Sequence, residues 1–215
     1  MKVGTDGVLL GAWARVEHCG HILDIGTGTG LLSLMAAQRS PADIVALDLD
    51  GNAVAQAADN VAASPWGQRI QVLEADIKTW HHEPVFDAIL CNPPFFDKSL
   101  KSPDAARTMA RHTDTLTFDE LTRSVSRLLA PDGEFSVVIP YDRANDMVVS
   151  AACHGLFTSR RTIVHPVEGG IAKRILMAFT REGAPHQPER LCIHDVGRHY
   201  TPEYVAMMQP FYLKL

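Results

Sequence analysis

Short apolar runs alternate with segments of helical periodicity along most of the chain. Strands that alternate with helices in this way are typical of a largely parallel sheet with helices on both faces. The predicted strands span residues 21–25, 44–48, 70–75, 86–91, 134–139, 158–164 and 174–180. The predicted helices span residues 6–16, 30–39, 52–63, 117–129, 142–154 and 202–208. The pattern therefore predicts a Rossmann-like α/β fold with a seven-stranded, mostly parallel sheet.

The last two predicted strands are joined by a short connector at residues 166–170. A parallel crossover needs about a dozen or more residues, so this connector favours an antiparallel pair. We expect that pair at one edge of the sheet. There the charged side chains of Arg160, Arg161, Lys173 and Arg174 would discourage edge-to-edge aggregation.

The length of 215 residues suits one α/β domain with a full hydrophobic core and is short for two. No internal repeat or low-complexity tract divides the chain. We therefore predict a single domain over residues 1–215, in which residues 183–215 form a C-terminal extension packed on the rest.

Three of the predicted helices begin with a capping signal. Asp6 is predicted to cap the first helix, and Asp50 is assigned to capping or to solvent contact ahead of the third. Thr117 is predicted to cap the fourth helix, with Asp119 and Glu120 in its first turn.

Composition narrows the class of protein. Apolar residues make up 46% and charged residues 21%, and no apolar run approaches the ~18–20 residues that cross a bilayer. The four cysteines are far apart and the ten histidines show no metal-ligand spacing, which argues against a disulfide framework or a zinc site. We expect no membrane or metal partner, a cytoplasmic location and a monomer.

The net charge of −5 argues at first against a nucleic-acid partner. The charge is unevenly distributed, because residues 1–95 carry 5 Lys and Arg against 11 Asp and Glu, a net of −6. Residues 96–215 carry 15 against 14, a net of +1. An RNA surface formed by the second part of the chain is compatible with this distribution.

A glycine-rich segment follows the first predicted strand, where Asp24 precedes Gly26, Gly28 and Gly30. Glycine permits positive φ and lets a ligand approach the backbone, and ligands of doubly wound sheets bind at the carboxyl ends of the strands. Leu31 stands where the dinucleotide fingerprint has its third glycine, which disfavours an NAD-dependent oxidoreductase. Taken alone, the segment is also compatible with a tight turn between a strand and a helix.

Two further acids end the next two predicted strands. The Asp48 carboxylate is suited to accept hydrogen bonds from ribose hydroxyls, and that of Asp76 from an adenine amino group. Acids on successive strands suit a nucleoside without phosphate, because carboxylates repel a pyrophosphate. S-Adenosylmethionine (AdoMet), which carries a sulfonium and an ammonium cation, is therefore the predicted cofactor, with S-adenosylhomocysteine as its product.

The fourth predicted strand ends in Asn92-Pro93-Pro94-Phe95. An amino group on adenine is a poor nucleophile, because its lone pair is delocalised into the ring. The Asn92 side-chain oxygen and a prolyl carbonyl could hold both amino hydrogens, while consecutive prolines keep these acceptors in place. Phe95 offers a face for stacking the base. These four residues are the predicted catalytic group, and Asn92 is expected to touch the cofactor as well.

Four basic residues follow the catalytic group: Lys98, Lys101, Arg107 and Arg111. They are candidates for contacts with RNA phosphates. The alternative is a solvated loop of mixed charge, and the sequence does not separate the two.

With these motifs in hand, the chain resembles the class I AdoMet methyltransferases that act on amino groups. More closely, it is similar to the bacterial valine-tRNA (adenine-37-N6)-methyltransferase family. The likeness covers nearly the whole chain, and the residues that carry it are 1–7, 9–13, 23–30, 92–96 and 200–204.

The resemblance implies roles for individual residues. Thr5 and Asp6 would lie near the amino-acid end of AdoMet, and the glycine segment with Asp24 would form its main cradle. Asp48 would bind the ribose and Asp76 the adenine of the cofactor. The Asn-Pro-Pro-Phe corner would hold the target, the adenine just 3′ of the valine-tRNA anticodon, for methylation at N6.

One departure from the family concerns the start of the chain. Family members carry a further basic and aromatic segment ahead of the stretch that begins here at Met1. The RNA affinity and the closure over AdoMet that such a segment would give are therefore not expected from the printed residues alone.

Three other functions stay open. Protein-glutamine N5-methyltransferases such as the release-factor enzymes use the same chemistry, but they favour Tyr at the position of Phe95 and carry an N-terminal helical domain. A DNA adenine-N6 methyltransferase would need a target-recognition domain, which is not visible. The intact Asn-Pro-Pro-Phe corner argues against a non-catalytic AdoMet- or RNA-binding module.

Overall fold

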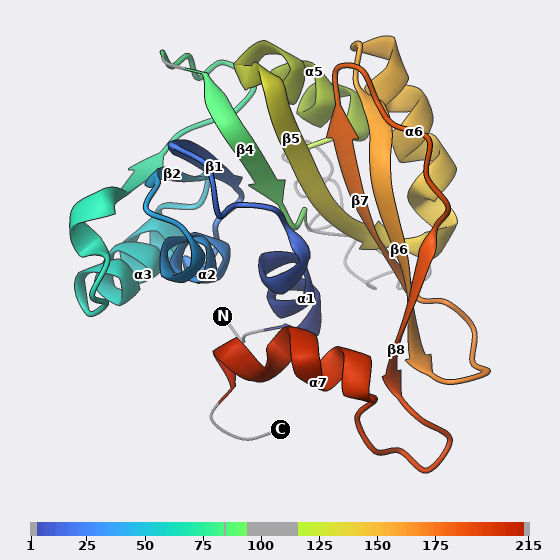
Figure 1. The fold of residues 1–215 in the computed structure, drawn as a ribbon. Helices are drawn as coiled ribbons and strands as arrows, with labels where there is room; N and C mark the ends of the chain where they lie inside the picture. The colour runs from blue at the N-terminus through green and yellow to red at the C-terminus, as the bar shows by residue number, and fades with distance from the viewer. Residues whose placement is uncertain (1–3, 84, 94–115, 213–215) are drawn as a thin grey trace, which may run out of the picture.

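The computed structural model describes residues 4–83, 85–93 and 116–212 of the chain (Figure 1). These residues form one eight-stranded sheet in the order β3-β2-β1-β4-β5-β7-β6-β8. Its strands are β1 His21–Ile25, β2 Asp43–Asp48, β3 Ile70–Glu74, β4 Phe86–Cys91, β5 Leu129–Pro140, β6 Phe157–Val167, β7 Arg174–Thr180 and β8 Glu189–His194. The α-helices are α1 Thr5–Trp13, α2 Leu31–Arg39, α3 Gly51–Ala62, α5 Phe118–Leu128, α6 Ala144–Cys153 and α7 Pro202–Met208. Short 3-10 helices are η1 Gly67–Arg69, η2 Tyr141–Arg143 and η3 Gln209–Phe211.

Strands β3, β2, β1, β4 and β5 run parallel to one another, and β7 runs antiparallel to both β5 and β6. From β1 the chain builds one half of the sheet through β2 and β3, and then crosses to β4 on the other side of β1. Such a reversal of strand order opens a crevice at the carboxyl ends of the two central strands. The ends of β1 and β4 are therefore the expected place for a ligand.

The sheet separates two hydrophobic cores, because successive side chains of a strand point to opposite faces. On β1, Ile22 belongs to the core under α1, α2 and α7, whereas Leu23 and Ile25 belong to the core under α5 and α6. The central strands are consequently apolar at nearly every position, as expected for a sheet covered on both faces.

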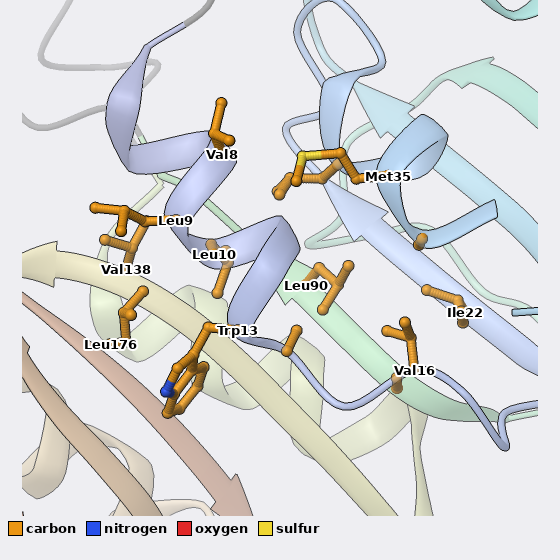
Figure 2. Packing of buried hydrophobic residues seen from close by; sticks show 14 of the residues in the cluster. Val8, Leu9, Leu10, Trp13, Val16, Ile22, Met35, Leu90, Val138 and Leu176 are labelled. Carbon is orange, nitrogen blue, oxygen red and sulfur yellow. The ribbon is translucent and has the colours of Figure 1, made fainter. Parts of the chain in front are cut away.

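Helix α1 is fixed firmly to its face of the sheet. Figure 2 shows Leu9 beside Val138 of β5 and Leu176 of β7, and all three side chains are buried. A Cβ on Gly11 would lie 2.5 Å from Sδ of Met35 on α2, so any larger residue here would force the Met35 side chain to move. The first turn of α1 is thereby held at the carboxyl edge of the sheet.

The predicted elements agree closely with the observed ones. The bounds of β1, β4, β7 and α7 are those predicted, and two capping assignments are confirmed. Asp50 accepts a hydrogen bond from the Asn52 N–H at 2.9 Å, and Thr117 forms a capping box with Glu120. The helix that Thr117 caps ends at Leu128, where the chain enters β5 directly.

The predicted cap at Asp6 is wrong. Gly4 occupies the cap position of α1, where no side chain makes a capping hydrogen bond. Asp6 lies in the first turn, and its Oδ2 accepts a hydrogen bond from Nε of Arg174 at 2.8 Å. The Asp6 carboxylate therefore pairs with Arg174 on β7 and does not make the helix cap that the sequence had predicted.

The edge of the sheet also differs from the prediction. Residues 183–215 were expected to form an extension packed on the domain, but β8 joins the sheet as an eighth strand, parallel to β6. The antiparallel strand β7 therefore lies inside the sheet and not at its edge. Only Leu191 of β8 is buried, so the strand has little of the apolar alternation that identifies strands in a sequence.

One of the residues expected to protect that edge is instead packed inside the fold. The Arg160 guanidinium lies 3.5 Å from the centre of the Trp13 ring, and its Nη1 donates to the Trp13 carbonyl at 3.1 Å. Its Nη2 donates to Glu134 at 3.3 Å, and only 15% of the side chain is exposed. Arg160 thus joins β6 to α1 and β5.

None of the helices in residues 4–83, 85–93 and 116–212 combines the length and the apolar character of a membrane span.

Candidate active site

The glycine segment forms a sharp loop between β1 and α2. Gly26, Gly28 and Gly30 have φ of 70°, 58° and 81°, a region that other residues rarely adopt. The N–H groups of Gly26 and Thr27 both donate to the Leu47 carbonyl at 2.9 Å, which ties the loop to the end of β2. A Cβ on Gly26 would have no atom within 4 Å, so the backbone there is open to a ligand.

Asp24 lies beneath this loop and is fully buried. Its Oδ2 accepts hydrogen bonds from Oγ1 of Thr27 at 2.6 Å and from Oγ of Ser33 at 2.7 Å. Its Oδ1 is buried with no hydrogen-bond partner among the described residues. Burial raises the pKa of Asp24 to about 6, against the lowering effect of these hydrogen bonds. Through its hydrogen bonds with Thr27 and Ser33, the Asp24 side chain joins the glycine loop to the start of α2.

Asp48 stands at the mouth of the crevice, at the end of β2. Its Oδ2 accepts from the Gly28 N–H at 2.8 Å and its Oδ1 from the Asp50 N–H at 3.0 Å. A carboxylate oxygen has two lone pairs, so each oxygen keeps one for a further donor. The side chain is held in place by the backbone and is still able to accept two hydrogen bonds from a ligand.

Asp76 begins the turn that follows β3. Its Oδ1 accepts from the Lys78 N–H at 2.9 Å, and its Oδ2 lies 3.5 Å from Nζ of Lys78. Helix α5 holds this turn from the other side, because Arg127 donates to the carbonyls of Trp80 and Ile77 at 2.6 and 3.0 Å. The sequence motifs gave no indication of this role for Arg127.

Asn92 follows β4, which pairs directly with β1, so the Asn-Pro corner lies next to the glycine loop. Asn92 is half-buried and Pro93 is buried. A Cβ on Gly7 would lie 3.7 Å from Nδ2 of Asn92, which places the first turn of α1 against the Asn92 side chain. Cys91, just before it, is buried, and burial raises the pKa of its thiol well above the ordinary value, which disfavours a nucleophilic thiolate.

These elements surround one pocket with a volume of about 560 Å³. A volume of this size suits a small ligand or cofactor. Its lining residues are Ile25, Gly26, Leu47, Asp48, Leu49, Asp50, Ala75, Asp76, Ile77, Lys78, Cys91, Pro93 and Leu116. The structure thus brings Gly26, Asp48, Asp76 and Pro93 together, as expected of one site.

Sequence reasoning missed the apolar walls of this pocket, Leu49, Ile77 and Leu116. Leu49 is 54% exposed, which is unusual for a large apolar side chain beside a strand end. A signal for two of these residues was present, since Leu49 follows Asp48 directly and Ile77 follows Asp76. An acid followed by an apolar residue offers a hydrogen-bond acceptor and a hydrophobic surface at the same place.

Thr5 and Asp6 do not line this pocket. They line a second hollow with Arg174, on the other side of the first turn of α1. Contact of these two residues with a cofactor stays a prediction. Six of the predicted residues lie outside the part of the chain that the structure describes: Pro94, Phe95, Lys98, Lys101, Arg107 and Arg111.

The pocket fits AdoMet in its chemistry. The loop at Gly26 leaves open backbone, Asp48 and Asp76 provide carboxylates, and the apolar walls suit the faces of a purine. A cationic ligand would also be attracted by these acids. Among the described residues, no group of His, Cys, Asp and Glu side chains could hold a metal ion.

Comparison with known proteins gives matches over the whole chain. The family model for the methyltransferase small domain matches residues 4–152. The chain is similar to a tRNA1(Val) (adenine(37)-N6)-methyltransferase of Bacteroides fragilis, with 47% identity over 219 residues that cover all of this chain and 92% of the relative. A protein of the same name from Phocaeicola vulgatus is 50% identical over 216 residues, again covering all of this chain and 92% of the relative.

Solved structures agree on the fold. A predicted O-methyltransferase from Agrobacterium tumefaciens matches with a TM-score of 0.68 at 21% identity, covering 95% of this chain and 96% of that one. A glycopeptide N-methyltransferase complexed with S-adenosylmethionine matches with a TM-score of 0.58 at 16% identity, covering 86% and 90%.

Proposed function

This chain belongs to the family of tRNA1(Val) (adenine(37)-N6)-methyltransferases, and we propose that it transfers a methyl group from AdoMet to N6 of adenine 37 in a valine tRNA. The proposal is supported most directly by the position of Asn92. It lies at the end of β4, beside the strand that carries the glycine loop, and its neighbours Cys91 and Pro93 both line the pocket.

The pocket residues would bind and orient the cofactor. The Gly26–Gly30 loop would receive its amino-acid end, the free lone pairs of Asp48 would accept from the ribose hydroxyls, and Asp76 would accept from the adenine amino group. Leu49 and Ile77 would contact the adenine ring. When bound, AdoMet supplies a methyl group on a sulfonium, which is electrophilic without further activation.

Asn92 would position the target nitrogen. Its side-chain oxygen and the Pro93 carbonyl provide two acceptors for the two hydrogens of an exocyclic amine. An amine held in this way tends towards a pyramidal shape, and its lone pair then points away from both acceptors. Pro93 has a fixed φ and is buried, so the acceptors need little reorganisation during the reaction.

Most of the remaining rate acceleration would come from proximity and alignment of the two reactants. A general base with a tuned pKa is not required, because the nitrogen becomes cationic as the N–C bond forms and then loses a proton readily. On this proposal, the described residues would bind the cofactor and orient the target amine, which are the main demands of this reaction.

The substrate class can be tested by supplying the wild-type protein with labelled AdoMet and separate pools of tRNA, DNA and peptides. We expect label in tRNA, recovered after digestion as N6-methyladenosine. Label recovered only in DNA or in a glutamine side chain would replace the tRNA assignment with one of its rivals. Binding of AdoMet without transfer to any pool would favour a non-catalytic role.

A further inference from the structure

A second hollow lies at the same edge of the sheet as the cofactor pocket. Its volume is about 330 Å³, and it is formed by the first turns of α1, the end of β6, the start of β7 and part of β8. Strands β5 and β6 are both antiparallel to β7, so β6 ends at the same edge as β4 and β5. One turn of α1 separates the hollow from Asn92, since Gly7 packs against Asn92 while Thr5 and Asp6 line the hollow.

The charges at the hollow favour an anion. Lys173 and Arg174 are adjacent and both line it, and Asp6 is the acid beside them, so the three side chains carry a net charge of +1. Arg174 holds Asp6 through its Nε at 2.8 Å, which neutralises the carboxylate. Lys173 is exposed, and its ammonium group makes no ion pair or hydrogen bond with the described residues. Among the described residues, neither of the exposed acids Asp142 and Glu168 forms an ion pair with Lys173 or Arg174.

An exposed aromatic residue adjoins these cations through a backbone hydrogen bond. Tyr141 follows β5, and its N–H donates to the Lys173 carbonyl at 3.2 Å, which fixes the two residues side by side. Tyr141 is 43% exposed. Cations next to an exposed aromatic ring are the combination with which proteins bind single-stranded nucleic acid, through phosphate contacts and base stacking. We call Tyr141, Lys173 and Arg174 the edge patch.

The position of the edge patch matches what the proposed reaction requires. The target adenine must leave its stack to reach Asn92, while the sugar-phosphate chain on either side of it stays outside the site. The β1–β3 side of Asn92 holds the cofactor pocket. The second hollow lies on the β5–β8 side of Asn92, where a bound RNA strand would not overlap the cofactor.

We propose that the edge patch binds the nucleotide that adjoins the target adenine in the RNA, with Lys173 and Arg174 on its phosphate and Tyr141 stacked on its base. This inference rests on the proposed function. It adds a substrate site on the opposite side of Asn92 from the cofactor pocket, made from residues that the sequence motifs do not include.

The test measures binding of fluorescently labelled valine tRNA at several salt concentrations, together with kcat and KM for tRNA. Lys173→Ala is expected to weaken tRNA binding about fivefold and to reduce the log–log salt slope by about 1. Tyr141→Leu is expected to weaken binding about tenfold by loss of stacking, whereas Tyr141→Phe keeps the ring and binds as the wild type does. The change should appear in KM for tRNA, with the dissociation constant for AdoMet unchanged.

Arg15→Ala is the matched control, because Arg15 is an exposed cation between α1 and β1, at the opposite edge of the sheet. We expect it to bind tRNA as the wild type does. Wild-type tRNA affinity in both Lys173→Ala and Tyr141→Leu would overturn the inference, and so would an equal loss in Arg15→Ala. Methyl transfer by the wild type reports on the proposed function, while the ratio of variant to wild-type tRNA affinity reports on the edge patch, so the two can fail separately.

Discussion

On the β1–β3 side of Asn92, the polar groups of the site are held by the backbone around them. Asp48 accepts from the Gly28 and Asp50 N–H groups, and Asp76 accepts from the Lys78 N–H. On the β5–β8 side, the polar groups are the exposed ends of Lys173 and Tyr141. The first side is suited to a small ligand with fixed shape, and the second to a polymer that approaches from solvent.

This difference predicts that substitutions on the two sides affect different measurements. Changes around the pocket should alter cofactor affinity or stability, changes at the edge patch should alter tRNA affinity, and Asn92 between them should alter the transfer step alone. The following variants test that separation, from the largest expected effect to the smallest.

Asn92→Ala should lower kcat by about 10²–10³-fold or more, because it removes an acceptor aimed at the reacting amine. The dissociation constant for AdoMet, measured by calorimetric titration, should stay close to that of the wild type. Full activity in this variant would remove Asn92 from the mechanism. A large loss of AdoMet affinity would show that its main role is in the cofactor pocket.

Asp24→Asn tests the buried acid beneath the glycine loop. Burial raises the pKa of Asp24 from 3.8 to about 6, so the folded protein binds this proton more tightly than the unfolded chain does. The free energy of unfolding should therefore fall by about 3 kcal/mol in total as the pH rises from about 3 to about 7, and then level off. Denaturant titrations should show this fall in the wild type but not in Asp24→Asn. Parallel pH profiles for the two proteins would contradict the assignment.

Asp48→Ala should weaken AdoMet binding about tenfold to hundredfold, because a charged acceptor for two ribose hydroxyls is lost. Asp43→Ala is the control at the other end of β2, where the side chain is exposed and away from the pocket. It should bind AdoMet as the wild type does. Equal affinities in the two variants would remove Asp48 from the cofactor site.

Arg127→Ala should weaken AdoMet binding about fivefold, because two charge-assisted hydrogen bonds no longer hold the turn at Ile77 and Trp80. Arg123, one turn earlier on α5, is the matched control, since it pairs with the exposed Asp119. Its replacement by Ala should change neither AdoMet affinity nor stability by more than about 0.5 kcal/mol. Equal effects of the two changes would mean that Arg127 does not position the turn.

The two sides of the site also differ in how well the sequence predicted them. The glycine loop, the acid that ends β2 and the acid in the turn after β3 are local features, since a residue that comes just after a strand lies at the carboxyl edge. These residues meet in one pocket because the strands are parallel, and the alternation of strands and helices in the sequence indicates a parallel sheet.

Contacts between distant segments were the ones that sequence reasoning missed. Arg160 packs on Trp13, 147 residues away, and Arg174 pairs with Asp6, 168 residues away. Neither pairing has a spacing or motif to reveal it. Strand β8 was missed because its side chains are mostly half-buried or exposed and give no apolar alternation. It is a strand because its backbone pairs with β6. The edge patch is likewise not visible in the sequence, because the β5–β7 pairing is what brings Tyr141 and Lys173 together.

The central claim is that the site presents an exocyclic amine of the tRNA to the cofactor. The most direct test compares two synthetic valine tRNAs in single-turnover reactions with labelled AdoMet, one with adenosine at position 37 and one with purine riboside, which lacks the amino group. We predict one methyl group on the first, recovered as N6-methyladenosine, and none on the second, with similar binding of both. Equal methylation of the two tRNAs would contradict the claim.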